Sequence, residues 1–139
     1  MSYIVEREII TGTRIERKEI KRVEDWLGVE FESSCYSTPE FMAFAAMYKK
    51  RINKEIELFG MKVVKWSNGH FYCSAFIENI KTGKLAYLSI SDVRHFSGSW
   101  YGNILVRTAK SLKDYCGGSN HSSKLSEVGS ALAKLTEAT

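Results

Sequence analysis

Residues 39–59 carry apolar side chains at helical spacing, and this pattern constrains the fold more than any other part of the chain. Successive apolar positions lie four, three, four, four and three residues apart, which places them on one stripe of a helix. Thr38 suits the N-cap, Pro39 the first helical position, and Gly60 a left-handed end. The sequence therefore predicts a long helix laid on a sheet, with a stripe formed by Phe41, Ala45, Tyr48, Ile52, Ile56 and Phe59.

Three strands are predicted after this helix, over residues 61–66, 70–78 and 84–92. Asn68-Gly69 favours a two-residue hairpin turn between the first two strands, and Thr82-Gly83 favours the next turn. In the middle strand, Phe71, Cys73, Ala75 and Ile77 alternate with Tyr72, Ser74 and Phe76; in the third, Leu85, Tyr87 and Ser89 alternate with Ala86, Leu88 and Ile90. Because both faces of these strands carry aromatic side chains, we expect the face away from the helix to meet a partner subunit or a ligand.

The two ends of the chain have weaker patterns. Residues 3–10 predict a strand, followed by a turn at 11–13, and residues 14–22 fit either the second strand of a hairpin or a short exposed helix. Residues 103–110 fit a strand or a helical turn. A closing helix is predicted after a cap at Ser122 or Ser123, with Leu125, Val128, Leu132 and Leu135 at helical spacing.

The predicted fold class is α+β: an antiparallel sheet of four or more strands, with one long helix on a face and a short C-terminal helix. A length of 139 residues corresponds to one domain, predicted to span residues 1–139. Apolar residues make up 44% of the chain, which excludes a disordered polymer, yet charges interrupt every apolar window that could span a membrane. The first eight residues lack the pattern of a signal peptide, so we expect a cytosolic protein.

Three widely separated cysteines, Cys35, Cys73 and Cys116, favour reduced thiols over a disulfide framework. His70 with Cys73, and Cys116 with His121, only approximate the paired spacing of zinc ligands. We therefore expect small buried side chains at the cysteines and predict neither a metal nor a cofactor.

No catalytic template is present. The sequence lacks a G-x-S-x-G elbow, a P-loop and a G-x-G-x-x-G turn, and nothing in it brings Cys35 next to a histidine base such as His70, His95 or His121. We therefore expect a protein that is not an enzyme.

Basic residues gather in the second half of the chain. The formal net charge is +4, and residues 81–113 hold Lys81, Lys84, Arg94, Arg107, Lys110 and Lys113 against the single acid Asp92. Such an excess favours an anionic partner, although a solvated lysine-rich face would give the same composition. Arginines interleaved with aromatic residues suit a ligand that has both a phosphate and a ring, and residues 117–120 could form an anion-binding loop ahead of a helix start. The alternative is structural: Arg94 and Arg107 pair with Asp92 and Asp114, Trp100 is a core residue, and the Gly-Gly segment is only a loop.

Several strings in the sequence resemble those of one family. They are Asp25–Gly28, Ser34–Phe41, Gly69–Tyr72, Ser91–Arg94, Arg107–Lys110 and Lys113–Asn120, and together they look like the phage anti-Thoeris proteins, which act as sponges for a defence signal. This resemblance covers residues 20–125. It implies a protein of the host cytoplasm that binds a cyclic ADP-ribose isomer made by a bacterial TIR-domain enzyme and holds it without cleavage. It also implies a homo-oligomer with ligand pockets at or near the subunit contacts, and relatives that hold cyclic oligonucleotides.

A ligand of this kind suggests a role for each candidate residue. Arg94 or Arg107 would bind the pyrophosphate, with Lys110 and Lys113 nearby. Stacking of the adenine would fall to Phe71, Trp100 or Tyr101, and the ribose hydroxyls would meet Asp92, Asn103 or Asn120. Two alternatives stay open: an anti-CRISPR-like inhibitor that binds a host nucleic-acid machine, and a cyclic-nucleotide hydrolase. Direct binding to nucleic acid is not expected.

Overall fold

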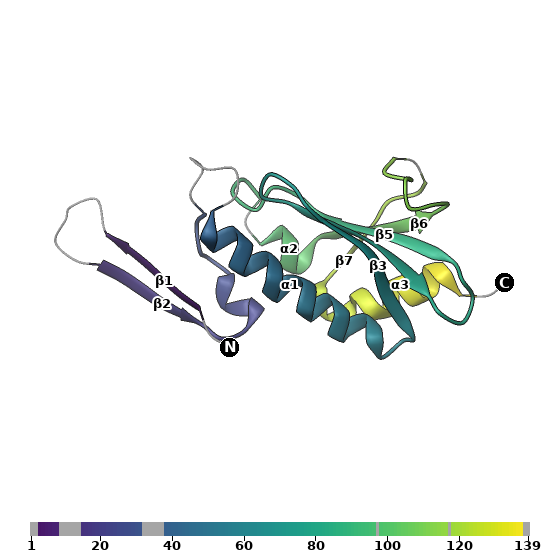
Figure 1. Cartoon of the computed structure of the whole chain (residues 1–139), viewed down its shortest axis with the longest axis horizontal. Helices are drawn as coiled ribbons and strands as arrows, with labels where there is room; N and C mark the ends of the chain where they lie inside the picture. Colours follow the sequence, from purple (N-terminus) through teal and green to yellow (C-terminus); the bar gives the residue numbers. More distant parts are fainter. Residues whose placement is uncertain (1–2, 9–14, 32–37, 97, 117, 138–139) are drawn as a thin grey trace.

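Helix α1 (Pro39–Glu57) lies along one face of a five-stranded antiparallel sheet in the computed structural model of the chain (Figure 1). The structure describes residues 3–8, 15–31, 38–96, 98–116 and 118–137. The sheet has the order β3-β4-β5-β6-β7, and its strands are β3 (Met61–Asn68), β4 (Cys73–Asn79), β5 (Leu85–Ile90), β6 (Ile104–Ala109) and β7 (His121–Ser123). This arrangement confirms the predicted α+β fold, and residues 103–110 prove to be a strand rather than a helical turn.

The long helix is confirmed with a small change at its C-terminal end. The Thr38 hydroxyl accepts a hydrogen bond from the Phe41 amide at 3.1 Å, as an N-cap should. The predicted stripe is buried from Phe41 to Ile56, and Phe44, which the sequence analysis did not include, is buried beside it. Phe59 lies beyond the helix end and is 47% exposed, so its place in the stripe was wrong. The chain turns away at Gly60, where φ is +71°.

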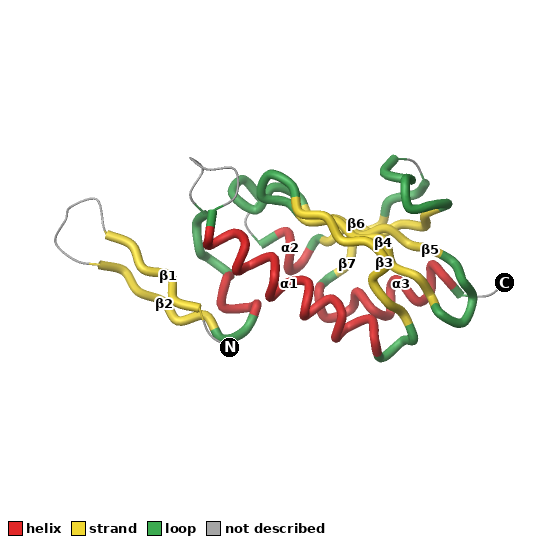
Figure 2. The backbone as a smooth tube through the Cα atoms, in the orientation of Figure 1, coloured by secondary structure: helices red, strands yellow, loops and turns green. Residues whose placement is uncertain are grey.

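The two faces of the sheet differ in what covers them. Cys73, Ala75 and Ile77 of β4 point into the core beneath the helices, together with the alternate residues of β5. All helices lie on this inner face, whereas the connection between β6 and β7 passes over the opposite, outer face (Figure 2). The strap, defined here as residues 110–116 of this connection, is thus separated from the core by the sheet. β7 pairs only with Ile104–Val106, the first half of β6.

The turn between β3 and β4 differs from its prediction. Asn68 is still in the strand, paired with Cys73, and the turn is formed by the four residues 69–72. It is closed by a hydrogen bond from the Gly69 amide to the Tyr72 carbonyl at 2.9 Å. The left-handed backbone falls on Phe71, with φ of +61°, although a bulky side chain is strained there. Asn-Gly did not form the turn because the Asn68 side chain accepts hydrogen bonds from Trp66 Nε1 and Cys73 Sγ, which hold it in the strand.

The N-terminal residues form a hairpin, the first of the two alternatives left open above. Strand β1 (Tyr3–Glu8) pairs with β2 (Ile15–Ile20), and the predicted turn at 11–13 lies outside the described residues. The hairpin extends past the N-terminal end of α1 (Figure 1). Its base is anchored by Ile20, which is fully buried, and by Tyr3, whose ring centroid lies 5.6 Å from that of Trp26 in the 3-10 helix η1 (Val23–Trp26).

The chain closes with the 3-10 helix η2 (Leu125–Glu127) and α3 (Val128–Thr136), while the short helix α2 (Ser99–Gly102) precedes β6. Leu125, Val128 and Leu132 are buried as predicted, and Leu135 packs partly against the core. The predicted cap was wrong, because Ser122 and Ser123 belong to β7 and the residue before η2 is Lys124.

Replacing Phe41 by Ala should lower the free energy of unfolding by about 3–5 kcal/mol, because the ring is fully buried between the helix and the sheet. The control is Met42→Ala on the same turn, where the side chain is 44% exposed and the change should stay within about 0.5 kcal/mol. Urea unfolding of both variants measures the difference. Equal stabilities would contradict the packing of α1 described above.

Candidate functional site

The structure divides the predicted site residues among three places. Phe71, Asp92 and Arg94 meet at one end of the sheet, and Trp100 with Tyr101 packs on the inner side. The remaining candidates are associated with the outer face and the strap: Asn103, Arg107, Lys110, Lys113 and Asn120. The expected convergence of all ten on one pocket is therefore not formed within a single chain.

Arg94 and Asp92 form a bidentate pair at the end of β5. Arg94 Nε donates to one Asp92 oxygen at 3.0 Å and its terminal nitrogen to the other, while the guanidinium carbon lies 4.3 Å from the Phe71 ring centroid. The Val93 amide donates to the Phe71 carbonyl at 2.9 Å and ties the two loops together. This is the structural alternative stated for Arg94. The pair and the stacked ring hold Phe71 in its strained backbone conformation.

The side-chain hydrogen bond from Arg94 lowers the pKa of Asp92 below its ordinary value. The pair therefore contributes stability at pH values above the ordinary aspartate pKa of about 3.9, and the contribution is lost as the pH falls through that value towards the lowered one.

We expect Asp92→Asn to be less stable than the parent chain at neutral pH, with the gap in melting temperature shrinking as the pH is lowered from about 7 to about 3. Thermal melts of both proteins across this range test the pair, since the other carboxylates titrate in both. A gap that stays constant with pH would show that Asp92 does not gain stability from its charge.

Trp100 and Tyr101 serve the core. Trp100 is only 2% exposed, its carbonyl accepts a hydrogen bond from the Tyr48 hydroxyl at 2.9 Å, and its ring centroid lies 5.1 Å from that of Phe44. Tyr101 packs edge-on against Trp100 and is half-buried. Because the Trp100 ring is buried by this packing, it offers no open surface on which a ligand could stack in this structure.

Arg107 lies on the outer face, and the aromatic ring beside it is Tyr87 rather than Phe71, Trp100 or Tyr101, which the sequence analysis named for stacking. Its guanidinium carbon is 4.4 Å from the centroid of Tyr87, the cross-strand neighbour on β5. It donates to the carbonyls of Thr108 and Asp114, and the Asp114 carboxylate lies 3.6 Å away. The side chain is 2% exposed, because the strap covers it.

A polar hollow opens beside Arg107, on the same outer face. It has a volume of about 190 Å³ and is lined by Ser89, Ser91, Asn103, Leu105, Asn120, His121 and Ser122. Ser89 is opposite Leu105, and Leu105 is opposite Ser122, so three strands present these side chains in one row. Hydroxyl and amide groups dominate the lining, and none of its residues carries a carboxylate. Such a surface can donate to and accept from hydroxyl groups without repelling an anion.

The sequence analysis found Asn103 and Asn120 but missed the serines around them. Its alternation for the third strand already placed Ser89 on the same face as Tyr87, and the structure shows that this face points away from the helix. Extending the same alternation by two residues adds Ser91. Ser122 could not be found in this way, because the segment containing it was taken as a helix cap.

The loop at residues 117–120, expected to bind an anion ahead of a helix, precedes a strand instead. Gly117 lies outside the described residues, and Gly118 has φ of +73°. The next element is β7 rather than a helix, so the predicted helix start after this loop was wrong. Asn120 instead contributes to the polar hollow from the end of the loop.

Another groove, of about 500 Å³, runs between β7 and α3. Glu127 and Lys134 line it together with small side chains of α3, and none of the ten predicted residues reaches it. Because this lining holds one carboxylate and one ammonium group and none of the predicted site residues, we place the candidate site on the outer face.

Membrane spans, cysteines and metal ligands were the further features considered from the sequence. The helices within the described residues are all too short or too polar to cross a lipid bilayer. Cys73 is buried, and its burial raises the pKa of the thiol to about 12, whereas Cys116 is exposed and Cys35 lies outside the described residues. In the described part of the chain, no three His, Cys, Asp or Glu residues lie together as a metal site would require.

No protein-family model, curated protein or solved structure matches this chain.

Proposed function

We propose that this protein binds and sequesters a cyclic ADP-ribose isomer without cleaving it, and so blocks TIR-dependent defence in the cytoplasm of a phage-infected host. The observation that carries the proposal is the outer face of β5, β6 and β7. There a hollow of hydroxyl and amide groups adjoins the stacked cation Arg107. A cyclic nucleotide offers the matching groups: ribose hydroxyls, a pyrophosphate and an adenine ring.

The polar hollow suits the ribose part of such a ligand. Asn103 and Asn120 each offer an amide donor and an acceptor, and the serines around them offer hydroxyl groups. Tyr87 and Arg107 lie two residues further along the same strands, about 7 Å from Ser89 and Leu105 of the hollow. The cation and the ring thus lie next to the hollow, beneath the strap that covers Arg107.

The volume of the hollow bears on the oligomeric state. Pockets for small molecules measure roughly 300–1,000 Å³, more than the hollow provides. A ligand seated in it would therefore extend over neighbouring surface. That surface belongs either to the same outer face or to a second copy of the chain, and the resemblance to the anti-Thoeris family favours a homo-oligomer with shared pockets.

The experiment is a calorimetric titration with cyclic ADP-ribose isomers and cyclic oligonucleotides, followed by heat denaturation and chromatography of the released ligand. We expect binding and recovery of the intact ligand, because capture in the hollow requires hydrogen bonds and not an acid–base pair. Release of a cleaved product would instead support the hydrolase alternative.

Replacing Asn120 by Ala should weaken the binding roughly tenfold, the loss expected when the ligand loses its hydrogen bonds to this exposed amide. The matched control is Asn53→Ala, which removes the same group from an exposed position of α1 on the other side of the sheet. Unchanged affinity in Asn120→Ala would remove the hollow from the binding site.

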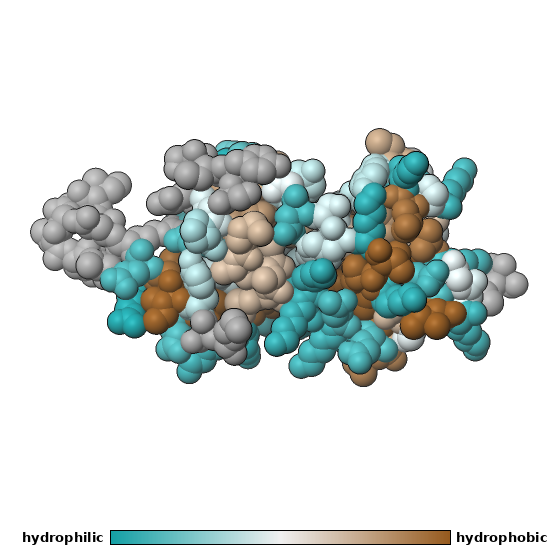
Figure 3. Space-filling view, viewed as in Figure 1, coloured by the Kyte–Doolittle hydropathy of each residue, from teal (hydrophilic) through white to brown (hydrophobic). Residues whose placement is uncertain are grey.

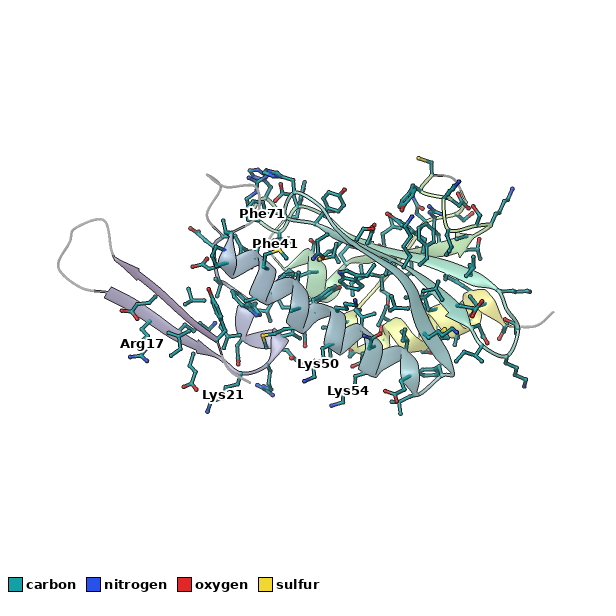
Figure 4. The ribbon with its side chains drawn as sticks, viewed as in Figure 1. Arg17, Lys21, Phe41, Lys50, Lys54 and Phe71 are labelled. Atoms are coloured by element: carbon teal, nitrogen blue, oxygen red, sulfur yellow. The ribbon has the colours of Figure 1, made fainter. Side chains whose placement is uncertain are left out.

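One observation favours the inhibitor alternative. Arg17 and Lys21 of the hairpin segment and Lys50 and Lys54 of α1 all project from the side of the molecule away from the sheet (Figure 4). All four side chains are exposed, and the space-filling view shows hydrophilic residues along this side, next to an apolar area over the N-terminal half of α1 (Figure 3). A basic side of this kind could contact a phosphate backbone or an acidic protein surface.

If this basic side contacts a phosphate backbone directly, Lys50→Glu with Lys54→Glu should abolish salt-dependent binding of duplex DNA, whereas Asn120→Ala should leave that binding unchanged. Fluorescence anisotropy at two salt concentrations measures both. Absence of DNA binding by the parent chain would eliminate direct nucleic-acid contacts as its mode of action.

A further inference from the structure

Four side chains form one cross-strand row on the outer face beneath the strap. Lys65 of β3 pairs with Phe76, Phe76 with Tyr87, and Tyr87 with Arg107. The Phe76 and Tyr87 ring centroids are 5.0 Å apart. Lys65 and Arg107 flank these rings, with Lys65 Nζ 5.9 Å from the Phe76 centroid. Phe76 is fully buried although it lies outside the core beneath the helices.

Two consecutive residues of the strap fill this row. The Tyr115 ring lies edge-on to Phe76 at 5.1 Å and to Tyr87 at 6.0 Å, and Lys65 Nζ is 5.1 Å from its centroid. The preceding residue, Asp114, places its carboxylate and its carbonyl against Arg107. The Asp114 carboxylate thus contacts Arg107, and the Tyr115 ring contacts Phe76, Tyr87 and Lys65.

The strap covers this row, but most of its own residues are exposed. Residues 110–113, 115 and 116 are exposed, and Tyr115 itself is 44% exposed. Arg107 contacts the Asp114 carboxylate from one nitrogen at 3.6 Å, whereas Arg94 grips Asp92 with two hydrogen bonds. Guanidinium groups prefer bidentate anions, and a phosphate would satisfy Arg107 better than this carboxylate does.

We propose that Asp114 and Tyr115 occupy a second nucleotide-binding subsite as an internal competitor, and that a nucleotide enters it by displacing the strap. The phosphate then replaces the Asp114 carboxylate on Arg107, and the base replaces the Tyr115 ring beside Phe76, Tyr87 and Lys65. This inference rests on the proposed function, because the row adjoins the polar hollow and completes a site that the hollow alone is too small to form.

The local charge supports an anionic occupant. Lys110 and Lys113 are exposed in the strap, whose Leu112 carbonyl accepts a hydrogen bond from Lys65 and whose Asp114 carboxylate contacts Arg107. Displacement of Asp114 by a diphosphate leaves the cations with a stronger partner, and the displaced carboxylate remains hydrogen-bonded to the Lys110 amide, at 2.9 Å in the closed strap.

The test uses ADP as the probe, titrated into the full chain by calorimetry. Tyr115→Ala removes the ring of the competitor and should strengthen ADP binding about tenfold. Tyr115→Phe keeps the ring and should leave the affinity unchanged. Adding Arg107→Met to Tyr115→Ala should abolish the gain, with thermal melts confirming that each variant is folded.

A second readout follows the strap directly. Trypsin cleaves after Lys110 and Lys113, and saturating ADP should accelerate this cleavage severalfold in the parent chain, because the displaced strap leaves the sheet. Slower or unchanged cleavage, or an affinity in Tyr115→Ala no higher than in the parent, would overturn the proposal.

These outcomes separate the two proposals. Binding of cyclic ADP-ribose that depends on Asn120, without any response of the strap, would leave the proposed function standing and remove the subsite. Tight ADP binding by Tyr115→Ala, without any affinity for cyclic ADP-ribose isomers, would keep the subsite and contradict the proposed function.

Discussion

The packing of α1 against the inner face of the sheet is the interaction on which the rest of this structure depends. Phe41, Phe44 and Tyr48 fill the space between helix and strands, and the Tyr48 hydroxyl fastens the chain before β6 by its bond to the Trp100 carbonyl. Because the helices cover the inner face of the sheet and form the core with it, the outer face can carry serines, a lysine and an arginine without disturbing that core. The candidate site therefore lies on the face of the sheet that does not pack against the helices.

The two arginines singled out in the sequence show how differently one residue type can be used. Arg94 is committed to a carboxylate two residues away and to the ring of Phe71, and it stabilises a strained turn. Arg107 is more deeply enclosed, yet its hydrogen bonds go to two backbone carbonyls, one of Thr108 in β6 and one of Asp114 in the strap. Judged by burial alone, both arginines would be structural. Their partners distinguish them: Arg94 forms a bidentate ion pair, whereas Arg107 contacts its carboxylate at 3.6 Å.

Periodicity was sufficient to predict α1 and the alternation of β4 and β5, because each of these elements must bury a continuous apolar face. It failed where a side chain had a choice of partners. Asn68 was expected in a turn but is held in the strand by Trp66 and Cys73, and Ser122 was expected at a helix end but lies in an edge strand. The site was predicted only in part for a related reason: Asn103, Arg107 and Asn120 are close in sequence, whereas Tyr87, Phe76 and Lys65 reach the same face through strand pairing.

The short pairing of β7 has a consequence for assembly. Because β7 covers only the first half of β6, the backbone of residues 107–109 forms a sheet margin that the neighbouring strand does not shield. The chain leaving the strap returns beside it, with Gly118 against the Thr108 carbonyl, and so blocks the approach of a foreign strand. Displacement of this segment would leave the margin at residues 107–109 open to pairing with another strand.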